Sequence, residues 1–179
     1  GRICAIGTDL VPESSTEVVD AGGKLILPGA IDGHTHLAMP FGGTISTDDY
    51  FTGTRAAACG GTTTVFDFVL QGVGETMDTA LDRRDALCRA DGPAIDYSYH
   101  IGVGDVTSRE MLMSMDRCIE RGVTSFKVFM VYDFGVDDGQ FFQTLQHAAE
   151  ICALVGVHAE NRDVNNCLIK QYLSEGKTD

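Results

Sequence analysis

Two histidines, His34 and His36, stand two residues apart in a short apolar segment entered through Leu27-Pro28-Gly29. In a β-strand, residues i and i+2 point to the same face, so the two imidazole rings would project side by side from a rigid backbone. That arrangement suits one metal ion with two imidazole ligands, although a strand can also carry two histidines on a polar face. The apolar residues before the pair and the Gly-rich stretch Met39-Pro40-Phe41-Gly42-Gly43 after it favour the metal site.

Lys127 is the second informative residue, because it lies inside the apolar run Phe126-Lys127-Val128-Phe129-Met130. A lysine in such a run is usually paired with a carboxylate or extends its amine to solvent. Beside strand-end histidines a different chemistry is favoured, in which the neutral amine takes up carbon dioxide and the two carbamate oxygens bridge two cations. Burial and adjacent metals promote loss of the ammonium proton, whose ordinary pKa is about 10.4. Lys127 therefore predicts a two-metal site with a hydroxide between the ions as the nucleophile.

Strand-like and helix-like segments alternate from residue 31 onwards. The expected strands span residues 31–37, 62–69, 94–102, 123–131 and 155–159, and the expected helices lie near residues 47–59, 75–90, 107–121, 138–154 and 162–175. Such alternation predicts an α/β fold with a parallel sheet and helices outside it. A doubly wound sheet would also fit, but the first strand is not followed by Gly-x-Gly-x-x-Gly. Polar residues at the ends of different strands favour a (β/α)8 barrel.

The expected elements make up about five of the eight strand–helix units of a TIM-type barrel, which takes about 250 residues. We therefore expect a partial barrel and a fragment of a longer protein, in which residues 29–179 form the N-terminal portion of the barrel. Residues 1–28 do not show this alternation of strand-like and helix-like segments. They contain β-rich segments at 2–7 and 17–27, which Gly and Pro interrupt. They are expected to form short strands of part of a small β-sandwich domain.

The composition of the chain restricts its partners. The 179 residues carry a net charge of -13, which argues against nucleic acid and against an anionic membrane surface. No apolar run is long enough to cross a bilayer, and no signal peptide is present. The six cysteines include no Cys-x-x-Cys pair, so we expect reduced, buried thiols in a cytoplasmic protein.

Three motifs at strand ends carry a family resemblance. Gly33-His34-Thr35-His36, the run around Lys127 and His158-Ala159-Glu160-Asn161 resemble the cyclic amidohydrolases, most closely the dihydropyrimidinase/D-hydantoinase group. Pro40-Phe41-Gly42-Gly43-Thr44 and Gly60-Gly61-Thr62-Thr63-Thr64 are similar to that group too, so the resemblance runs through about residues 24–179.

The resemblance implies metal ligands and substrate contacts. Two zinc ions, or other divalent metals, would be bridged by carboxylated Lys127, with His34 and His36 on one metal and His158 on the other. Tyr132 would hydrogen-bond the substrate carbonyl and steady the oxyanion, although a tyrosine also suits a barrel rim without such a role. The loop that carries Phe41 would contact the exocyclic group of the substrate.

The implied reaction is metal-dependent hydrolysis of a small cyclic ureide or imide, such as a dihydropyrimidine or hydantoin, to an N-carbamoyl amino acid. The resemblance also implies a homo-oligomer, a tetramer in many relatives. The family's further His after strand six and its Asp after strand eight lie outside this chain. The short loop 133–137 leaves the substrate preference open.

Three alternatives remain beside this function. A dihydroorotase or allantoinase is one, but dihydroorotases usually carry Arg shortly after His-x-His, where this chain has Leu37-Ala38-Met39. A non-catalytic dihydropyrimidinase-related scaffold is another, but such proteins lose metal ligands that this chain retains. The third is an inactive fragment that binds metal poorly.

Five further polar residues have weaker assignments. Asp67 is expected to be a structural hydrogen-bonding carboxylate, and His100 either lines the site or is a satisfied core histidine. His147 is expected to be solvated on its helix. Glu160 and Asn161 are expected to orient the region around His158.

Overall fold

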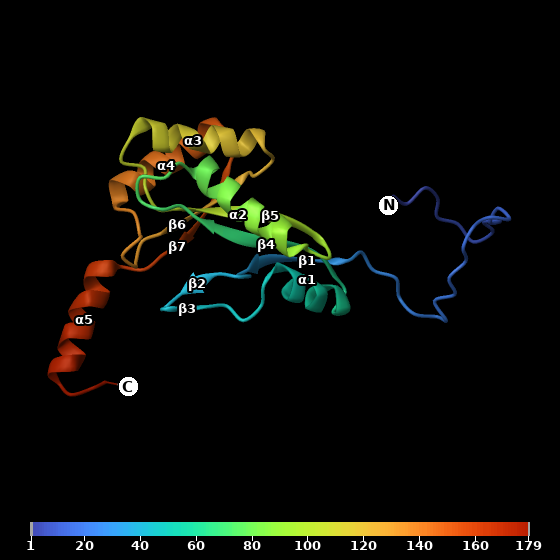
Figure 1. Ribbon diagram of the computed structural model, residues 1–179, viewed down its shortest axis with the longest axis horizontal. Helices are drawn as coiled ribbons and strands as arrows, with labels where there is room; N and C mark the ends of the chain where they lie inside the picture. Colours follow the sequence, from blue (N-terminus) through green and yellow to red (C-terminus); the bar gives the residue numbers. More distant parts are fainter. Residues whose placement is uncertain (1, 179) are drawn as a thin grey trace.

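The computed structural model describes residues 2–178 and contains one parallel sheet of five strands (Figure 1). The strands are β1 (Ala30–Thr35), β4 (Thr62–Leu70), β5 (Asp96–Val103), β6 (Ser125–Phe129) and β7 (Leu154–His158). Their order in the sheet, β1-β4-β5-β6-β7, follows the order of the chain. A doubly wound sheet reverses its strand order at a switch point, whereas a barrel wall winds in one direction. The α/β partial-barrel prediction is therefore confirmed.

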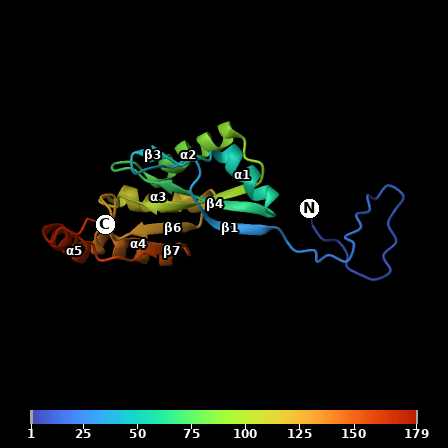
Figure 2. The same ribbon diagram turned by 90° about the horizontal axis from the view of Figure 1, so that it is seen from below.

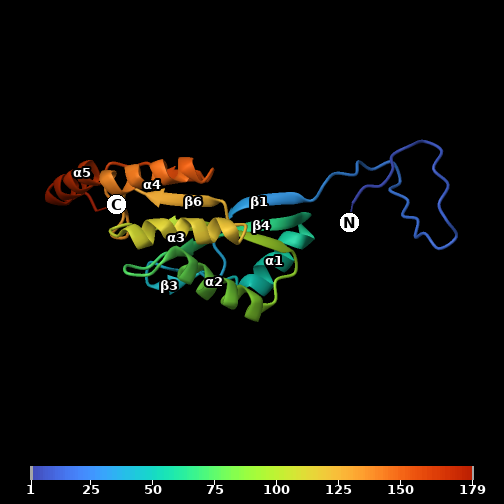
Figure 3. The same cartoon turned by 90° about the horizontal axis from the view of Figure 1, so that it is seen from above.

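A helix follows most strands, and each begins at a capping residue of the kind that the sequence indicates. The helices are α1 (Tyr50–Cys59), α2 (Met77–Asp91), α3 (Arg109–Glu120), α4 (Asp138–Glu150) and α5 (Arg162–Ser174). Asp49 and Asp137 form capping boxes at α1 and α4, and Ser108 caps α3. The helices α2 and α3 lie side by side over one face of the sheet (Figure 3). No helix among residues 2–178 is both long and apolar enough to cross a membrane.

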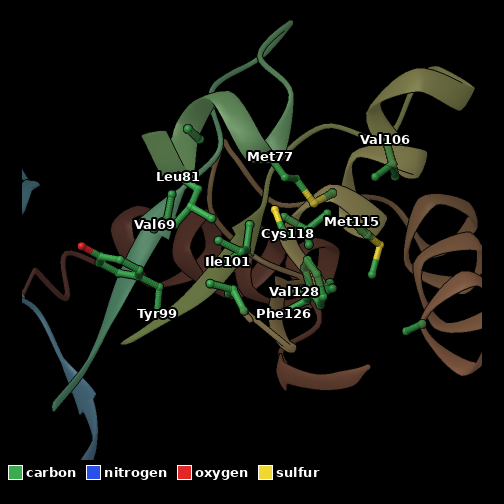
Figure 4. Close-up of a cluster of buried hydrophobic side chains, with 14 of the residues drawn as sticks. Val69, Met77, Leu81, Tyr99, Ile101, Val106, Met115, Cys118, Phe126 and Val128 are labelled. Carbon is green, nitrogen blue, oxygen red and sulfur yellow. The ribbon is translucent and has the colours of Figure 1, made fainter. Parts of the chain in front are cut away.

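The hydrophobic core lies between the sheet and these helices (Figure 4). Strand alternation turns Ile101, Phe126 and Val128 toward the helices, where they pack with Met77 and Met115, and all five side chains are at most 1% exposed. The intervening positions of the same strands face the other way. Polar groups on that second face are thereby separated from the core.

Residues 2–29 differ from the sequence-based expectation, because they contain no strand in the described structure. The segment is almost entirely exposed and runs away from the sheet, at the opposite end of the molecule from α5 (Figure 2). The β-rich composition at 2–7 and 17–27 does not suffice to form strands, because a strand needs the edge of a neighbouring strand to satisfy its backbone hydrogen bonds. The strand prediction is wrong here, and the assignment of residues 1–28 to a small β domain stays a prediction.

A two-stranded hairpin, absent from the sequence-based expectation, lies in the Gly-rich stretch after His36. Strands β2 (Pro40–Phe41) and β3 (Thr44–Ile45) pair antiparallel around Gly42 and Gly43. The backbone φ angles of these glycines are 59° and 82°, the left-handed values that a tight two-residue hairpin loop requires. The Gly-Gly pair between two short extended segments was the signal that could have predicted it.

All six cysteines are free thiols, but only two of them are buried. Cys88 and Cys118 lie on the core faces of α2 and α3, whereas the other four are exposed, namely Cys4, Cys59, Cys152 and Cys167. The expectation of buried thiols is therefore wrong for these four. Helix-like neighbours such as Ala and Leu do not determine which face of a helix a residue occupies.

The contact between α2 and α3 generates a prediction about acid stability. Arg117 donates two hydrogen bonds of 2.8 Å to the carboxylate of Asp78, and they lower the pKa of Asp78 from 3.8 to about 2. A carboxyl group with a depressed pKa stabilises the folded state above its ordinary pKa, and this contribution is lost as the pH falls toward the folded value. We expect Asp78→Asn to lower the free energy of unfolding at neutral pH and to flatten its decline between pH 3.8 and 2.

Urea unfolding followed by circular dichroism over a pH series measures this effect. A variant whose stability declines as steeply as that of the wild type over this interval would contradict the assignment.

Candidate active site

A cavity of about 610 Å³ lies at the carboxyl ends of the strands. Its lining includes the six side chains that the sequence singled out for metal or substrate contact, namely His34, His36, Phe41, Lys127, Tyr132 and His158. They come from β1 and the residue after it, the hairpin, β6, the loop after β6, and β7. Parallel pairing brings the carboxyl ends of all strands to one edge, so residues far apart in the chain meet there.

The two histidines converge on one point. The Nε2 atoms of His34 and His36 are 3.2 Å apart, and both rings pack against the ring of Phe68, which is 3% exposed. The pairing of β1 with β4 shifts register between Asp32 and Thr35, at the position of His34. Two protonated imidazoles would repel at this distance, so the pair must share one proton or one cation.

The electrostatic surroundings of His36 favour its neutral form. Partial burial is the main cause that lowers the pKa of His36, and the neighbouring His34 lowers it further. A neutral imidazole has a free lone pair, which is the form that ligates metals.

Lys127 lies on β6 between two glycines. Its neighbours in register are Gly102 on β5, where the side chain of Leu70 occupies the place of a Cβ atom, and Gly156 on β7, where a Cβ atom would make only ordinary contacts. A Cβ atom added to Gly156 would lie 3.7 Å from Cδ of Lys127. None of the ion pairs among residues 2–178 involves Lys127, so the expected alternative of a carboxylate partner is not found there.

His158 ends β7 and is held by the residues that follow it. Its Nε2 donates to the Glu160 carboxylate, which also accepts a 2.6 Å bond from Asn165. The hydrogen bond from His158 is the largest cause that lowers the pKa of Glu160, and the bond from Asn165 lowers it further. Asn161 caps α5 by accepting from the amide of Val164 at 2.9 Å. The contacts agree with the expected orienting role of Glu160 and Asn161, and they leave Nδ1 of His158 for a ligand.

Aromatic rings form the rim of the cavity around Tyr132. Its ring centroid lies 5.2 Å from that of Phe134, 5.5 Å from His158 and 6.3 Å from Phe41 on the hairpin. Tyr132 has a φ angle of 71°, a left-handed conformation that is uncommon for a residue with a side chain. The hairpin and the loop after β6 therefore face each other across the cavity.

Two other histidines lie outside this cavity. Nε2 of His100 donates to the carbonyl of Gly33 at 2.9 Å, and its Nδ1 accepts from the Ser125 hydroxyl, so both ring nitrogens are satisfied, although the side chain is only half-buried and does not belong to the core. His147 is buried and bonded to Asp116 at 2.6 Å, so its expected solvation is wrong. The reason is the packing of α3 against α4, which the sequence around His147 does not reveal.

Asp67 is fully buried and hydrogen-bonded, as expected of a structural carboxylate. Its charged partner, Arg84 of α2, was missed by sequence reasoning, because nothing in the helix sequence distinguishes it from the exposed Arg83 next to it. Within residues 2–178, no group of three His, Cys, Asp or Glu side chains is arranged to hold a metal ion. Beside the three histidines, the amine of Lys127 also lines the cavity.

Comparisons with known proteins give a consistent set of relatives, although no protein-family model matches the chain. The chain is 47% identical to a D-hydantoinase of Streptomyces coelicolor and 48% identical to one of Geobacillus stearothermophilus, over 100% of its own length and 39% and 38% of theirs. The solved structure of a dihydropyrimidinase from Brevibacillus agri superposes with a TM-score of 0.87 at 46% identity, covering 93% of this chain and 36% of that one. The chain thus spans less than two fifths of the length of these relatives.

The loop that carries Tyr132 generates a second prediction. A Cβ atom at Gly135 would lie 2.4 Å from the carbonyl oxygen of Val131 and 2.8 Å from that of Phe129, so Gly135→Ala forces the backbone to move. We expect it to destabilise the fold by about 1–3 kcal/mol and to abolish the ring contact between Tyr132 and Phe134.

Nuclear Overhauser effects between the two rings report this contact. Gly139→Ala is the control, because a Cβ there meets only an Asp137 side-chain oxygen at 3.2 Å. An intact Tyr132–Phe134 contact in the Gly135→Ala variant would refute the constraint.

Proposed function

The chain belongs to the D-hydantoinase/dihydropyrimidinase group, and on that premise we propose that it forms part of a metal-dependent hydrolase, which opens the ring of small cyclic ureides or imides. The substrate would be a 5,6-dihydropyrimidine or a hydantoin, and the product an N-carbamoyl amino acid. The observation that carries the proposal is the meeting of His34, His36, Lys127 and His158 around one cavity.

The histidine pair fits a zinc ion. Tetrahedral zinc with Zn–N bonds of about 2.0–2.1 Å holds two ligand nitrogens about 3.3 Å apart. The Nε2 atoms of His34 and His36 are 3.2 Å apart, which is close to that separation. We assign these two nitrogens to one metal and Nδ1 of His158, whose other nitrogen is bonded to Glu160, to a second.

Lys127 fits a carbamate that joins the two metals. The neutral amine would bond to the carbon of carbon dioxide and release one proton, which gives a group with one negative charge and two oxygens. Gly156 leaves the lysine stem free of a neighbouring side chain on the β7 side, where this larger group would need room. Carboxylation would replace the positive charge of Lys127, which has no carboxylate partner among the ion pairs of residues 2–178, with a negative charge that suits two cations.

The cavity residues would orient the substrate for attack on a ring carbonyl. Two bound zinc ions would polarise that carbonyl and make an ionised water available at neutral pH. Tyr132 would donate its hydroxyl proton in a hydrogen bond to the carbonyl oxygen, where negative charge develops in the transition state. Phe41 and Phe134 would contact the ring substituent and exclude bulk water from the reacting atoms.

The nearest alternative, a dihydroorotase-type hydrolase, is less favoured. Such an enzyme needs a cation near the histidine pair to hold a substrate carboxylate, and Leu37 and Ala38 instead pack against the hydrophobic core. We also propose a cytoplasmic homo-oligomer, a tetramer by family resemblance. The six free cysteines accord with a reducing compartment.

The function is tested through Lys127. The protein is purified without chelators in bicarbonate buffer, and its zinc content and its turnover of hydantoin and dihydrouracil are measured. We expect Lys127→Ala to lower zinc affinity by about 10- to 100-fold and to abolish ring opening, because the histidines would lose the group that joins them.

Lys170→Ala is the matched control, since Lys170 is an exposed lysine on α5. Zinc binding and turnover that survive Lys127→Ala would refute the carbamate bridge, and absence of zinc from the unaltered protein would refute the metal site.

Tyr132 generates a separate kinetic prediction. Tyr132→Phe keeps the ring and its stacking on Phe134 but removes the hydroxyl. A hydrogen bond made chiefly in the transition state appears in kcat, so we expect a decrease of about 10²- to 10³-fold in kcat with little change in KM. A rise in KM at unchanged kcat would show that the hydroxyl contributes only to ground-state binding.

A further inference from the structure

A buried ionic cluster lies behind the wall of the cavity, on the helix side of β4. It consists of Asp67, Arg84 of α2 and Tyr50 of α1, which are 0%, 6% and 0% exposed. Arg84 donates to Oδ2 of Asp67 through Nη2 at 2.6 Å and through Nε at 3.1 Å, and the Tyr50 hydroxyl donates to the same oxygen. The guanidinium carbon of Arg84 also lies 5.0 Å from the centre of the Tyr50 ring.

The hydroxyl of Tyr50 is a permanent donor in this cluster. Burial is the main cause that raises the pKa of Tyr50, and the adjacent Asp67 carboxylate raises it further. The phenol therefore keeps its proton, and with it its bond to Asp67, at neutral pH.

The cluster also holds the backbone that follows His36. Oδ1 of Asp67 accepts from the amide of Leu37 at 3.2 Å. Arg84 donates through Nη1 to the carbonyl of Ala38 at 3.1 Å and through Nη2 to the carbonyl of Leu37. One carboxylate and one guanidinium thus bind three backbone groups of the two residues immediately after the second histidine.

This backbone needs to be held, because it leaves β1 through a strained residue. Ala38 has a φ angle of 46°, in the left-handed region, which costs an alanine about 1–2 kcal/mol. The Arg84 bond to the Ala38 carbonyl stabilises this conformation. The cluster therefore helps to hold the path of the chain from His36 into the hairpin, together with the bond from the Ala38 amide to the carbonyl of Asp48 at 2.7 Å.

We infer that Asp67, Arg84 and Tyr50 form a positioning unit, which fixes the turn after His36 and so keeps Nε2 of His36 beside Nε2 of His34. The inference rests on the proposed function, since it assigns the unit to the metal-binding pair. None of the three residues lines the cavity, so they hold the histidine pair through the backbone of residues 37 and 38.

Stability alone does not account for this unit. A buried carboxylate–guanidinium pair loses most of its Coulomb gain to desolvation, and apolar residues of similar volume often stabilise a core as well. The directional bonds to Leu37 and Ala38 are what apolar residues could not supply.

A second ion pair of the same chemistry provides a matched control. Arg117 holds Asp78 through two bonds of 2.8 Å between α2 and α3, and neither residue lines the cavity. A lysine at either arginine position keeps the charge but loses the planar fork. Arg84→Lys therefore disturbs the bonds to the backbone after His36, whereas Arg117→Lys disturbs a comparable ion pair that does not contact this backbone.

The experiment measures two quantities in both variants. Amide hydrogen exchange at Leu37 is followed by NMR in the metal-free protein, and zinc affinity is measured by titration against a competing chelator. We expect Arg84→Lys to accelerate exchange at Leu37 by at least about tenfold and to weaken zinc binding by about tenfold. Arg117→Lys should change neither quantity, in buffer conditions that give the two variants equal global stability.

Tyr50→Phe tests the same unit with a smaller change, and it replaces Arg84→Lys should that variant not fold. It removes only the hydroxyl bond to Asp67, so we expect a smaller acceleration at Leu37 in the same direction.

The outcomes separate this inference from the proposed function. Exchange at Leu37 that matches the Arg117→Lys control in both Arg84→Lys and Tyr50→Phe would overturn the positioning role. Absence of zinc binding in the unaltered protein would overturn the proposed function instead, and exchange at Leu37 would still decide whether the unit fixes the turn.

Discussion

Parallel pairing of five strands is the constraint on which the rest of the structure depends. It places the carboxyl ends of β1, β6 and β7 at one edge, so that His34, Lys127 and His158 line a single cavity although they are far apart in the chain. Register supplies the finer placement, because Lys127 pairs with a glycine on each neighbouring strand and Phe129 pairs with His158. Alternation of side chains along β6 sends Phe126 and Val128 to the helices and leaves Lys127 for the cavity.

Strand β4 shows how the two faces of the sheet cooperate. Phe68, on the cavity face, packs against both histidine rings, while the adjacent Asp67, on the helix face, binds the backbone after them. The histidines are thus supported through their rings from one side and through the chain from the other. A pair of metal ligands that already stands in place binds an ion more tightly, since any reordering on binding weakens affinity. For the proposed metal pair, the buried side chains of Phe68, Asp67 and Arg84 would meet this requirement.

Much of this arrangement could be predicted from the sequence, because it depends on local patterns. Alternating strand-like and helix-like segments indicated the order of the elements, and the types and spacing of His34, His36 and Lys127 indicated which side chains meet at the cavity. The failures have a common physical cause, which is contact between distant segments. Residues 2–29 have β-rich composition but no partner edge, and His147 is buried only because α3 packs on α4. Arg84 cannot be distinguished from Arg83 until α2 is docked on β4.

One measurement tests the central claim most directly, namely that carboxylated Lys127 joins two metal ions held by the histidines. Crystals grown with zinc and bicarbonate would be measured at the zinc absorption edge, where anomalous scattering locates the ions. The account predicts one anomalous peak between Nε2 of His34 and Nε2 of His36, a second beside His158, and density for a carbamate on Nζ of Lys127. An unmodified Lys127 with no anomalous peak at the His34–His36 pair would contradict it.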